Sequence, residues 1–270
     1  MATPPFVETK EYRRFAEFCE ACRRYRSIGL CYGRPGVGKT LSARHYARWD
    51  QLEPAVREAW AQAPPVPAEL IARRTLFDTV SMTTTPKRLE QDLSRLGNGF
   101  KLLVGSVLAP DQDPLERTVA HLKGPPVAEV LVVDEVDRLK FPVLEQLRHL
   151  SDEGGFGLVL IGMPGLQKRL SRYPQLYSRV GFVHEFRPLS PEELRFLLEQ
   201  RGQQLGLTVD LTQFDDVEAL TAIIRITGGN FRLVQRLFAQ IERILQVNQL
   251  HAVTKEVVEA ARENLVIGPA

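Results

Sequence analysis

Short apolar runs alternate with amphipathic stretches over the first two thirds of the chain. The apolar runs lie at residues 27–32, 75–80, 130–133, 157–161 and 182–186. Runs of this length, rich in aliphatic and β-branched residues, are typical of strands buried on both faces of a parallel sheet. Because amphipathic segments separate them, we expect an α/β fold with a parallel five-stranded sheet, sandwiched by helices and joined by right-handed crossovers.

The intervening segments predict helices at 6–25 (with its lead-in), 39–48, 83–96, 113–123, 141–150 and 165–173. The first should pack on the sheet edge. Thr85 and Pro86 supply a cap and a first-turn proline to the third, so Lys87 and Arg88 should lie at its N-terminus. Prolines in the stretch 50–68 indicate a short helix and a connection, and the glycines in 97–110 indicate an irregular loop.

Past Pro188 the pattern predicts helices alone, at 190–205, 214–227, 230–247 and 254–265. Ser190 and Glu193 have the spacing of a capping box, which marks the start of the first of them. We therefore expect three parts: an N-terminal helix with its linker (1–25), an α/β domain (26–188) and an all-helical lid (189–270).

The phosphate-loop pattern G-x-x-x-x-G-K-[ST] is filled at every position by Gly33-Arg34-Pro35-Gly36-Val37-Gly38-Lys39-Thr40. A predicted strand precedes it and a predicted helix follows, as the motif requires. Glycines let backbone N–H groups surround a polyphosphate, Lys39 reaches the β- and γ-phosphates, and the Thr40 hydroxyl is placed to ligate Mg²⁺. The alternative, an accidental glycine-rich turn, leaves the Lys-Thr pair and both flanking elements unexplained. A nucleoside triphosphate with Mg²⁺ is the predicted ligand.

Asp134 and Glu135 end the apolar run at 130–133. Ligands bind at the carboxyl ends of strands in open α/β sheets, so Asp134 is expected to hold Mg²⁺ and Glu135 to polarise the attacking water. An Asp-Glu pair alone would equally fit a capped strand end beside a solvated turn. The phosphate loop favours the catalytic interpretation.

The composition and the net charge of the chain exclude few classes of function. The 270 residues include 44% hydrophobic ones, yet no apolar run of about eighteen residues and no hydrophobic signal core, so we expect a cytoplasmic protein. Cys19 and Cys22 have C-x-x-C spacing, but without a second ligand pair the segment is better explained as helix than as zinc site. The net charge of +2 neither demands nor excludes nucleic acid, and the basic clusters are as well explained by solvated helix faces.

Taken together, these motifs resemble the AAA+ ATPases. The basis is the phosphate loop, the strand ending in Asp134-Glu135, a later strand-helix-strand unit ending near an arginine, and the lid segment Gly228-Gly229-Asn230-Phe231-Arg232. Within that family the chain looks most similar to the transposition regulators, which include the phage Mu B protein, TnsC, TniB and IstB. This finer resemblance depends on Pro5-Phe6-Val7-Glu8-Thr9, Val133-Asp134-Glu135-Val136-Asp137-Arg138-Leu139 and Leu158-Val159-Leu160-Ile161-Gly162.

The resemblance implies ATP-dependent oligomerisation, as a ring or helical filament, on double-stranded DNA, with target selection and activation of a partner transposase. It also implies roles for residues outside the two motifs. Phe6, Val7 and Leu41 would contact the nucleotide, Arg179 would act as an arginine finger on the neighbouring subunit's ATP, and Arg232 would be the lid sensor. Either arginine could instead be a surface or helix-capping residue.

DNA contacts are expected at Lys87 and Arg88, where the resemblance places a channel-lining helix N-terminus, and then at Lys101 in the 97–110 segment. One position departs from the family pattern. Gly162-Met163-Pro164 follows the fourth strand, where relatives carry a polar residue that orients the attacking water; a thioether is only a weak acceptor. Hydrolysis is therefore expected to be slow. The alternatives are a replication initiator or loader ATPase, and a nucleotide-gated scaffold in which hydrolysis is incidental.

Overall fold

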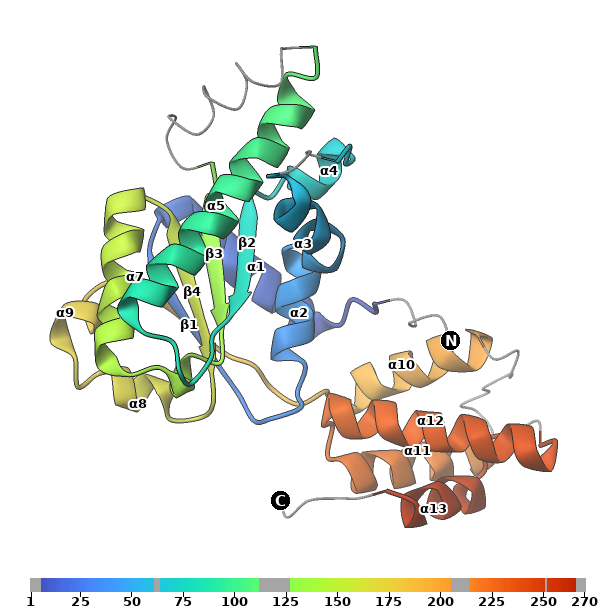
Figure 1. Ribbon diagram of the computed structural model, residues 1–270. Helices are drawn as coiled ribbons and strands as arrows, with labels where there is room; N and C mark the ends of the chain where they lie inside the picture. Colours follow the sequence, from blue (N-terminus) through green and yellow to red (C-terminus); the bar gives the residue numbers. More distant parts are fainter. Residues whose placement is uncertain (1–5, 61–63, 112–126, 205–213, 251, 266–270) are drawn as a thin grey trace. The chain divides into compact units, whose positions relative to one another are not determined.

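Five parallel strands form one sheet in the order β2-β3-β4-β1-β5 (Figure 1). Their bounds are β1 Ile28–Tyr32, β2 Thr75–Thr79, β3 Val130–Asp134, β4 Gly157–Gly162 and β5 Val180–Glu185. All four pairings are parallel, so every strand ends at the same edge of the sheet. The predicted fold class is confirmed, and all five strands were found from their apolar runs.

The computed structural model describes residues 6–60, 64–111, 127–204, 214–250 and 252–265, with the backbone alone at 201–204 and 214–216. The chain divides into two units. The sheet unit comprises Tyr12–Gly33 and Lys39–Glu185, and the helical unit comprises Met1–Glu11, Arg34–Gly38 and Phe186–Ala270. The helix predicted at 113–123 lies outside the described residues. No helix in the described ranges is both long and apolar enough to cross a membrane.

Helices lie on both faces of the sheet, with α5 and α7 in front and α1 behind in Figure 1. The helices of this part of the chain are α1 Lys10–Tyr25, α2 Lys39–Tyr46, α3 Trp49–Glu58, α4 Ala68–Ile71, α5 Pro86–Leu108, η1 Val136–Arg138, α7 Phe141–Gly154, α8 Leu166–Leu170 and α9 Pro174–Tyr177. The helix predicted at 165–173 is present as the shorter α8, and α9 was not predicted. Pro174 starts a new first turn there, since a proline cannot donate an intrahelical hydrogen bond.

Helix α1 lies across the face of the sheet rather than at its edge, where it was predicted to pack. A Cβ atom on Gly29 would lie 2.3 Å from Cys22 Sγ, and one on Gly157 would lie 2.3 Å from the Cys22 carbonyl oxygen. These two glycines belong to the neighbouring strands β1 and β4. Their missing side chains let the helix approach the two strands closely, which apolar periodicity alone did not indicate.

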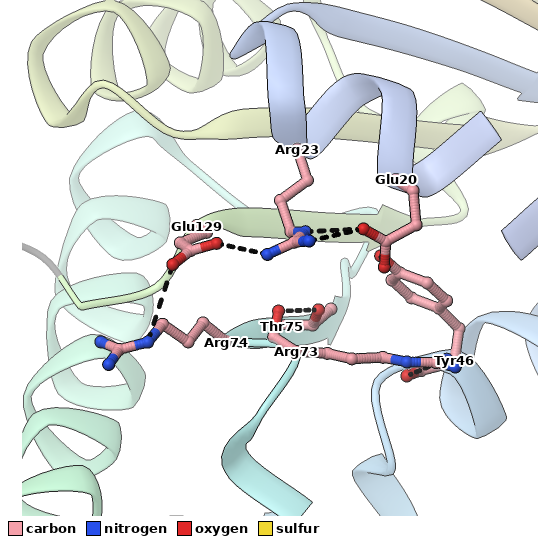
Figure 2. A network of polar contacts seen from close by, with 7 residues as sticks. All are labelled: Glu20, Arg23, Tyr46, Arg73, Arg74, Thr75 and Glu129. Atoms are coloured by element: carbon pink, nitrogen blue, oxygen red, sulfur yellow. Dashed lines mark hydrogen bonds and ion pairs between the residues drawn. The ribbon is translucent and has the colours of Figure 1, made fainter. Parts of the chain in front are cut away.

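Polar contacts join α1 and α2 to the amino ends of β2 and β3 (Figure 2). Arg23 donates to Glu20 at 2.8 Å and to Glu129 at 2.6 Å. Arg74 lies 3.6 Å from the other oxygen of Glu129, and the Tyr46 hydroxyl donates to Glu20 at 2.8 Å. Single exposed ion pairs contribute little, but a connected set fixes the relative positions of its members. This network stabilises the edge of the sheet at which the strands begin. The predicted site lies at the opposite edge, where the strands end.

Helix α5 continues through the segment that we predicted to be an irregular loop. Gly99 sits in the middle of the helix, and a Cβ atom there would lie 2.3 Å from the Val56 carbonyl oxygen of α3. Phe100, Leu103 and Val104 are fully buried at helical spacing. The loop prediction was wrong because a glycine that permits close helix packing was interpreted as a helix breaker. Lys101 therefore lies on a helix.

The helical unit is built from α10 Pro191–Gln204, α11 Phe214–Thr227, α12 Phe231–Asn248 and α13 Lys255–Glu263. Its core gathers aliphatic side chains from all four helices, and Val7 packs against it. The predicted capping box is present. Glu193 N–H donates to Ser190 Oγ at 3.2 Å, and the Ser190 N–H donates to Glu193 Oε2 at 3.0 Å. Glu193 also accepts the Glu11 N–H at 3.0 Å, so the capping residue ties the N-terminal segment to α10.

Candidate nucleotide site

The first and last residues of the phosphate loop belong to the sheet unit. Gly33 continues from β1, and α2 begins at Lys39, as the motif predicted. Only 8% of the Lys39 surface is exposed, and its Nζ donates to the Gly33 carbonyl oxygen at 2.6 Å. A buried ammonium group needs partners because it has lost its hydration. This hydrogen bond holds the ammonium beside the first residue of the loop, and a phosphate-loop lysine contacts phosphate oxygens from this position.

Asp134 ends β3 beside the first turn of α2. Its Oδ2 accepts the Thr40 hydroxyl at 2.5 Å, and its Oδ1 accepts the Glu135 N–H at 2.8 Å. Burial raises the pKa of Asp134 above its ordinary value, although the Thr40 hydrogen bond and the Lys39 charge oppose the increase. A buried carboxylate whose ionised form is disfavoured is stabilised by a nearby cation. Because Mg²⁺ takes hydroxyl and carboxylate oxygens, Thr40 and Asp134 fit the predicted metal role.

Glu135 has an unusual backbone conformation for a side-chain-bearing residue. Its φ angle is 59°, in the left-handed region, at the point where β3 turns into η1. Its carboxylate forms an ion pair with Arg138, one turn further along the chain. Strained backbone at a strand end is common at functional sites, where the surrounding structure maintains it. Here the turn presents Glu135 at the carboxyl edge, next to Asp134.

Asp137 supports the turn that follows β4. Its Oδ1 accepts the Met163 N–H at 2.9 Å, and a Cβ atom on Gly162 would lie 2.6 Å from that same oxygen. Arg169 donates to the Asp137 carbonyl oxygen at 2.6 Å and also to that of Leu139. The structure thus places Met163 at the carboxyl end of β4, and Asp137 is engaged in holding that turn.

The middle of the phosphate loop belongs to the helical unit. Gly36 and Gly38 have φ angles of 81° and 111°, which side-chain-bearing residues rarely adopt. Asn230 Nδ2 donates to the Pro35 carbonyl oxygen at 2.8 Å, and the Arg232 N–H donates to the Gly36 carbonyl oxygen at 2.9 Å. Sequence reasoning found Arg232 but missed Asn230 as a site residue. Its place as N-cap of α12, directly before that helix, was the available signal.

The remaining predicted site residues occupy separate places. Arg179 directly precedes β5; its side chain is 59% exposed, and its Nε lies 3.6 Å from Asp152 Oδ2. Leu41 is 37% exposed on α2. Lys87 and Arg88 lie in the first turn of α5, where the Thr85 hydroxyl accepts the Arg88 N–H at 3.3 Å, so their predicted location is confirmed. Phe6, like Val7, belongs to the helical unit.

A loop of this sequence after β1, with an Asp-Glu pair at the end of β3 two strands away in the same sheet, defines a P-loop nucleotide-binding protein. An AAA-domain family model matches residues 22–170 of the 270. The chain therefore belongs to the AAA family of P-loop ATPases.

Several known proteins are similar to this chain in sequence. The chain is 45% identical over 271 residues to a protein of Staphylococcus aureus described as a potential ATP-binding protein, with 97% of each chain covered. It is 25% identical to the Mu-like prophage FluMu DNA transposition protein B of Haemophilus influenzae, over 87% of this chain and 72% of that one. It is 26% identical to the ATP-dependent target DNA activator B of Escherichia phage Mu, over 66% of this chain and half of the activator.

Solved structures show the same fold. The Thermotoga maritima RuvB Holliday junction branch migration motor matches with a TM-score of 0.60 and 19% identity, over 96% of this chain and 70% of that one. The Aeropyrum pernix ORC2 protein matches with a TM-score of 0.60 and 16% identity, over 97% and 69%. Such distant likenesses establish the fold alone. The similarity to the Mu B proteins comes from the sequence.

Proposed function

We propose that the chain is an ATP-dependent, DNA-binding regulator of transposition. It binds ATP with Mg²⁺, oligomerises on duplex DNA, selects the target and activates a partner transposase. The observation that carries the nucleotide part is the Thr40–Asp134 contact beside Lys39, which joins the phosphate loop to the carboxyl end of β3. The transposition part is supported by the similarity to a prophage protein named as a DNA transposition protein B and to a phage protein named as an ATP-dependent target DNA activator B.

The chemistry assigned to the chain's own residues is phosphoryl transfer to water. Lys39 binds phosphate oxygens, Thr40 and Asp134 hold the metal, and Glu135 takes a proton from the attacking water. When bound, Mg²⁺ would neutralise charge on the phosphate oxygens. In the structure the Glu135 carboxylate is paired with Arg138 through its Oε2.

Slow turnover fits this role. Met163 offers only a thioether at the end of β4, so no side chain there is suited to orient water, and Asp137 is used to hold the Met163 N–H. A slowly hydrolysing subunit stays in its ATP state long enough to assemble on DNA. Arg179, exposed at the start of β5, would then complete the neighbouring subunit's site and couple hydrolysis to assembly.

A DNA-motor or replication-loader function is the second candidate. A specific observation favours it: the chain is 27% identical over 177 residues to the RuvB branch migration subunit of Treponema pallidum, over 59% of this chain and 48% of that one. The match to RuvB covers less of this chain than the match to the Haemophilus protein does. We therefore rank the motor or loader function second. A transposase gene next to this one would support the first candidate, and a helicase gene would support the second.

Electron microscopy of the protein with duplex DNA and a slowly hydrolysed ATP analogue tests the proposal. We expect rings or filaments on DNA that require the analogue and are absent with ADP. The Lys39→Ala variant should form none. Nucleotide-dependent oligomers that leave DNA bare would instead favour the scaffold alternative, in which nucleotide controls assembly alone.

A further inference from the structure

The first turn of α12 fastens the middle of the phosphate loop at two consecutive peptide units. Asn230 Nδ2 donates to the Pro35 carbonyl oxygen at 2.8 Å. The backbone N–H of Arg232 donates to the next carbonyl oxygen, that of Gly36, at 2.9 Å. All of these atoms belong to the helical unit, so the contact is internal to one unit.

The orientation of the Asn230 amide follows from its partners. Its Oδ1 accepts the Leu233 N–H at 3.3 Å and thereby caps α12, while its Nδ2 faces the Pro35 carbonyl oxygen. Leu233 N–H can only donate and the carbonyl oxygen can only accept, so exchanging the amide oxygen and nitrogen would break both hydrogen bonds. One side chain therefore caps the helix and also holds the loop.

These contacts determine which way the loop's N–H groups point. In a trans peptide unit the C=O and N–H bonds point in opposite directions, and no cis peptide bond occurs among the described residues. With the Pro35 and Gly36 carbonyls directed at α12, the N–H groups of Gly36 and Val37 must point away from it. A phosphate loop binds its ligand with backbone N–H groups of this kind.

Gly36 is shaped for the same contact. Its φ angle of 81° suits glycine, and a Cβ atom there would lie 2.5 Å from Asn230 Oδ1. The absence of a side chain at Gly36 thus lets Asn230 come close to the loop, and it also allows the backbone to turn there. This explains a glycine in the middle of the loop, at a position where the motif itself permits any residue.

We infer that Asn230 is a positioning residue, which preorganises the phosphate loop from the lid side and couples nucleotide binding to the order of α12. The inference depends on the proposed nucleotide binding and adds to it the means by which the helical unit senses the ligand. Linkage makes the coupling reciprocal. If the fastened loop binds ATP more tightly, bound ATP must stabilise the first turn of α12 by the same factor.

Two substitutions separate the loop contact from helix capping. Asn230→Ser and Asn230→Asp both keep an oxygen that can cap α12, since Ser, Asp and Asn are comparable N-caps. The aspartate carboxylate cannot donate to the Pro35 carbonyl oxygen and places an acceptor against it. The serine hydroxyl is itself a donor, but it ends one bond nearer the backbone than the amide nitrogen that makes this contact. Thr254→Ala is the matched control: Thr254 caps α13 by accepting the Val257 N–H at 3.4 Å, so this variant removes a lid cap without changing Asn230.

ATP affinity by calorimetry and amide hydrogen exchange in α12 are the two measurements. One neutral hydrogen bond corresponds to an affinity change of about twofold to tenfold, so we expect Asn230→Ser to bind ATP that much more weakly and Asn230→Asp more weakly still. Thr254→Ala should bind ATP like the wild type. ATP should slow exchange at Leu233 in the wild type and in Thr254→Ala, but less in Asn230→Ser.

Two outcomes would overturn the inference while leaving the proposed function intact: wild-type ATP affinity in both Asn230 variants, or an equal loss of affinity in Thr254→Ala. The second would mean that lid stability, rather than the loop contact, governs binding. If the wild-type protein itself binds no ATP, the proposed function fails first, and the inference fails with it.

Discussion

The Thr40 hydroxyl donates to Asp134 Oδ2 at 2.5 Å across a sequence separation of 94 residues. This contact joins the first turn of α2 to the end of β3, the two elements that carry the phosphate loop and the acidic pair. Asp134 is 3% exposed, so its charge is sheltered from water and depends on close partners. The hydroxyl and the carboxylate are thus already adjacent, as two ligands of a single metal ion must be.

The first prediction concerns the buried Lys39 ammonium and the binding of ATP. Lys39→Ala should abolish measurable ATP binding, because the cation that contacts the β- and γ-phosphates is removed while the apolar core is untouched. Calorimetry with ATP, alongside thermal unfolding, measures both effects. The control is Lys168→Ala, which removes an exposed lysine from α8 of the same unit. Unchanged ATP affinity in a folded Lys39→Ala protein would refute the phosphate-loop assignment.

Glu135 allows binding and chemistry to be separated. Glu135→Gln keeps the shape of the side chain but cannot act as a base, so ATP should still bind while turnover falls by about 10²-fold or more. Steady-state phosphate release measures turnover. Asp137→Asn is the matched control, since an amide retains an oxygen acceptor for the Met163 N–H, and its turnover should stay near that of the wild type. Wild-type turnover in Glu135→Gln would transfer the role to another carboxylate.

Arg179 is predicted to act on the neighbouring subunit. It lies 3.6 Å from Asp152, which also accepts from Arg148 at 2.7 Å, so an isolated subunit holds the guanidinium in an exposed ion pair that assembly can replace. ATPase activity per subunit should therefore rise with protein concentration.

Mixing two inactive variants tests this arrangement. Arg179→Ala and Lys39→Ala subunits should recover partial activity together, because a mixed interface can pair an intact loop with an intact Arg179. Arg172→Ala, which removes a nearby exposed arginine, should remain active alone. If mixed oligomers form and no activity returns, Arg179 has a structural role within its own subunit.

The strands and the phosphate loop were predictable because their signals are local. A strand that is buried on both faces of a sheet is a continuous apolar run, as at residues 130–133. The phosphate-loop pattern is likewise a contiguous stretch of sequence. The contact between Asn230 and Pro35 was not predictable, since it joins residues separated by 195 positions and no local pattern encodes the pairing.

Glycines caused the clearest errors. Gly97 and Gly99 were interpreted as a loop, yet Gly99 lies in α5 because the carbonyl oxygen of Val56 occupies the place of a side chain. Gly29 and Gly157 likewise admit α1 onto the sheet face. A glycine that breaks an element and one that permits close packing look the same in a sequence, and only the tertiary neighbour distinguishes them.

The cysteines of α1 are predicted to be unreactive in the folded protein. Burial raises the pKa of Cys22 to about 12 and also raises the pKa of Cys19, so almost no thiolate is present near neutral pH. Labelling by a thiol reagent at pH 8 should therefore proceed only as fast as the protein opens. Mass spectrometry of labelled peptides, with and without denaturant, measures this. Rapid labelling of either cysteine under native conditions would contradict the packing of α1 on the sheet.

The last prediction concerns duplex DNA. With a net charge of +2 a single subunit attracts a polyanion weakly, so binding should require ATP-dependent assembly that aligns a few cations per subunit along the phosphate backbone. Lys87 and Arg88 remain our candidates. The N-terminus of α5 adds the partial positive charge of the helix dipole to these cations, and the Arg88 side chain is 66% exposed, with Asp92 3.6 Å away.

Lys87→Ala combined with Arg88→Ala should lower the salt dependence of DNA binding, by about 0.9 in the logarithmic slope for each phosphate that is no longer neutralised, and leave ATP binding unchanged. Cations that bind phosphates position DNA without reading bases, so the decrease should be similar on unrelated sequences. Arg13→Ala combined with Arg14→Ala removes the same charge from α1 and serves as the control. Wild-type affinity and slope in the first double variant would exclude this surface. Lys101, which lies on the same helix rather than on a loop, would then be the next residue to change.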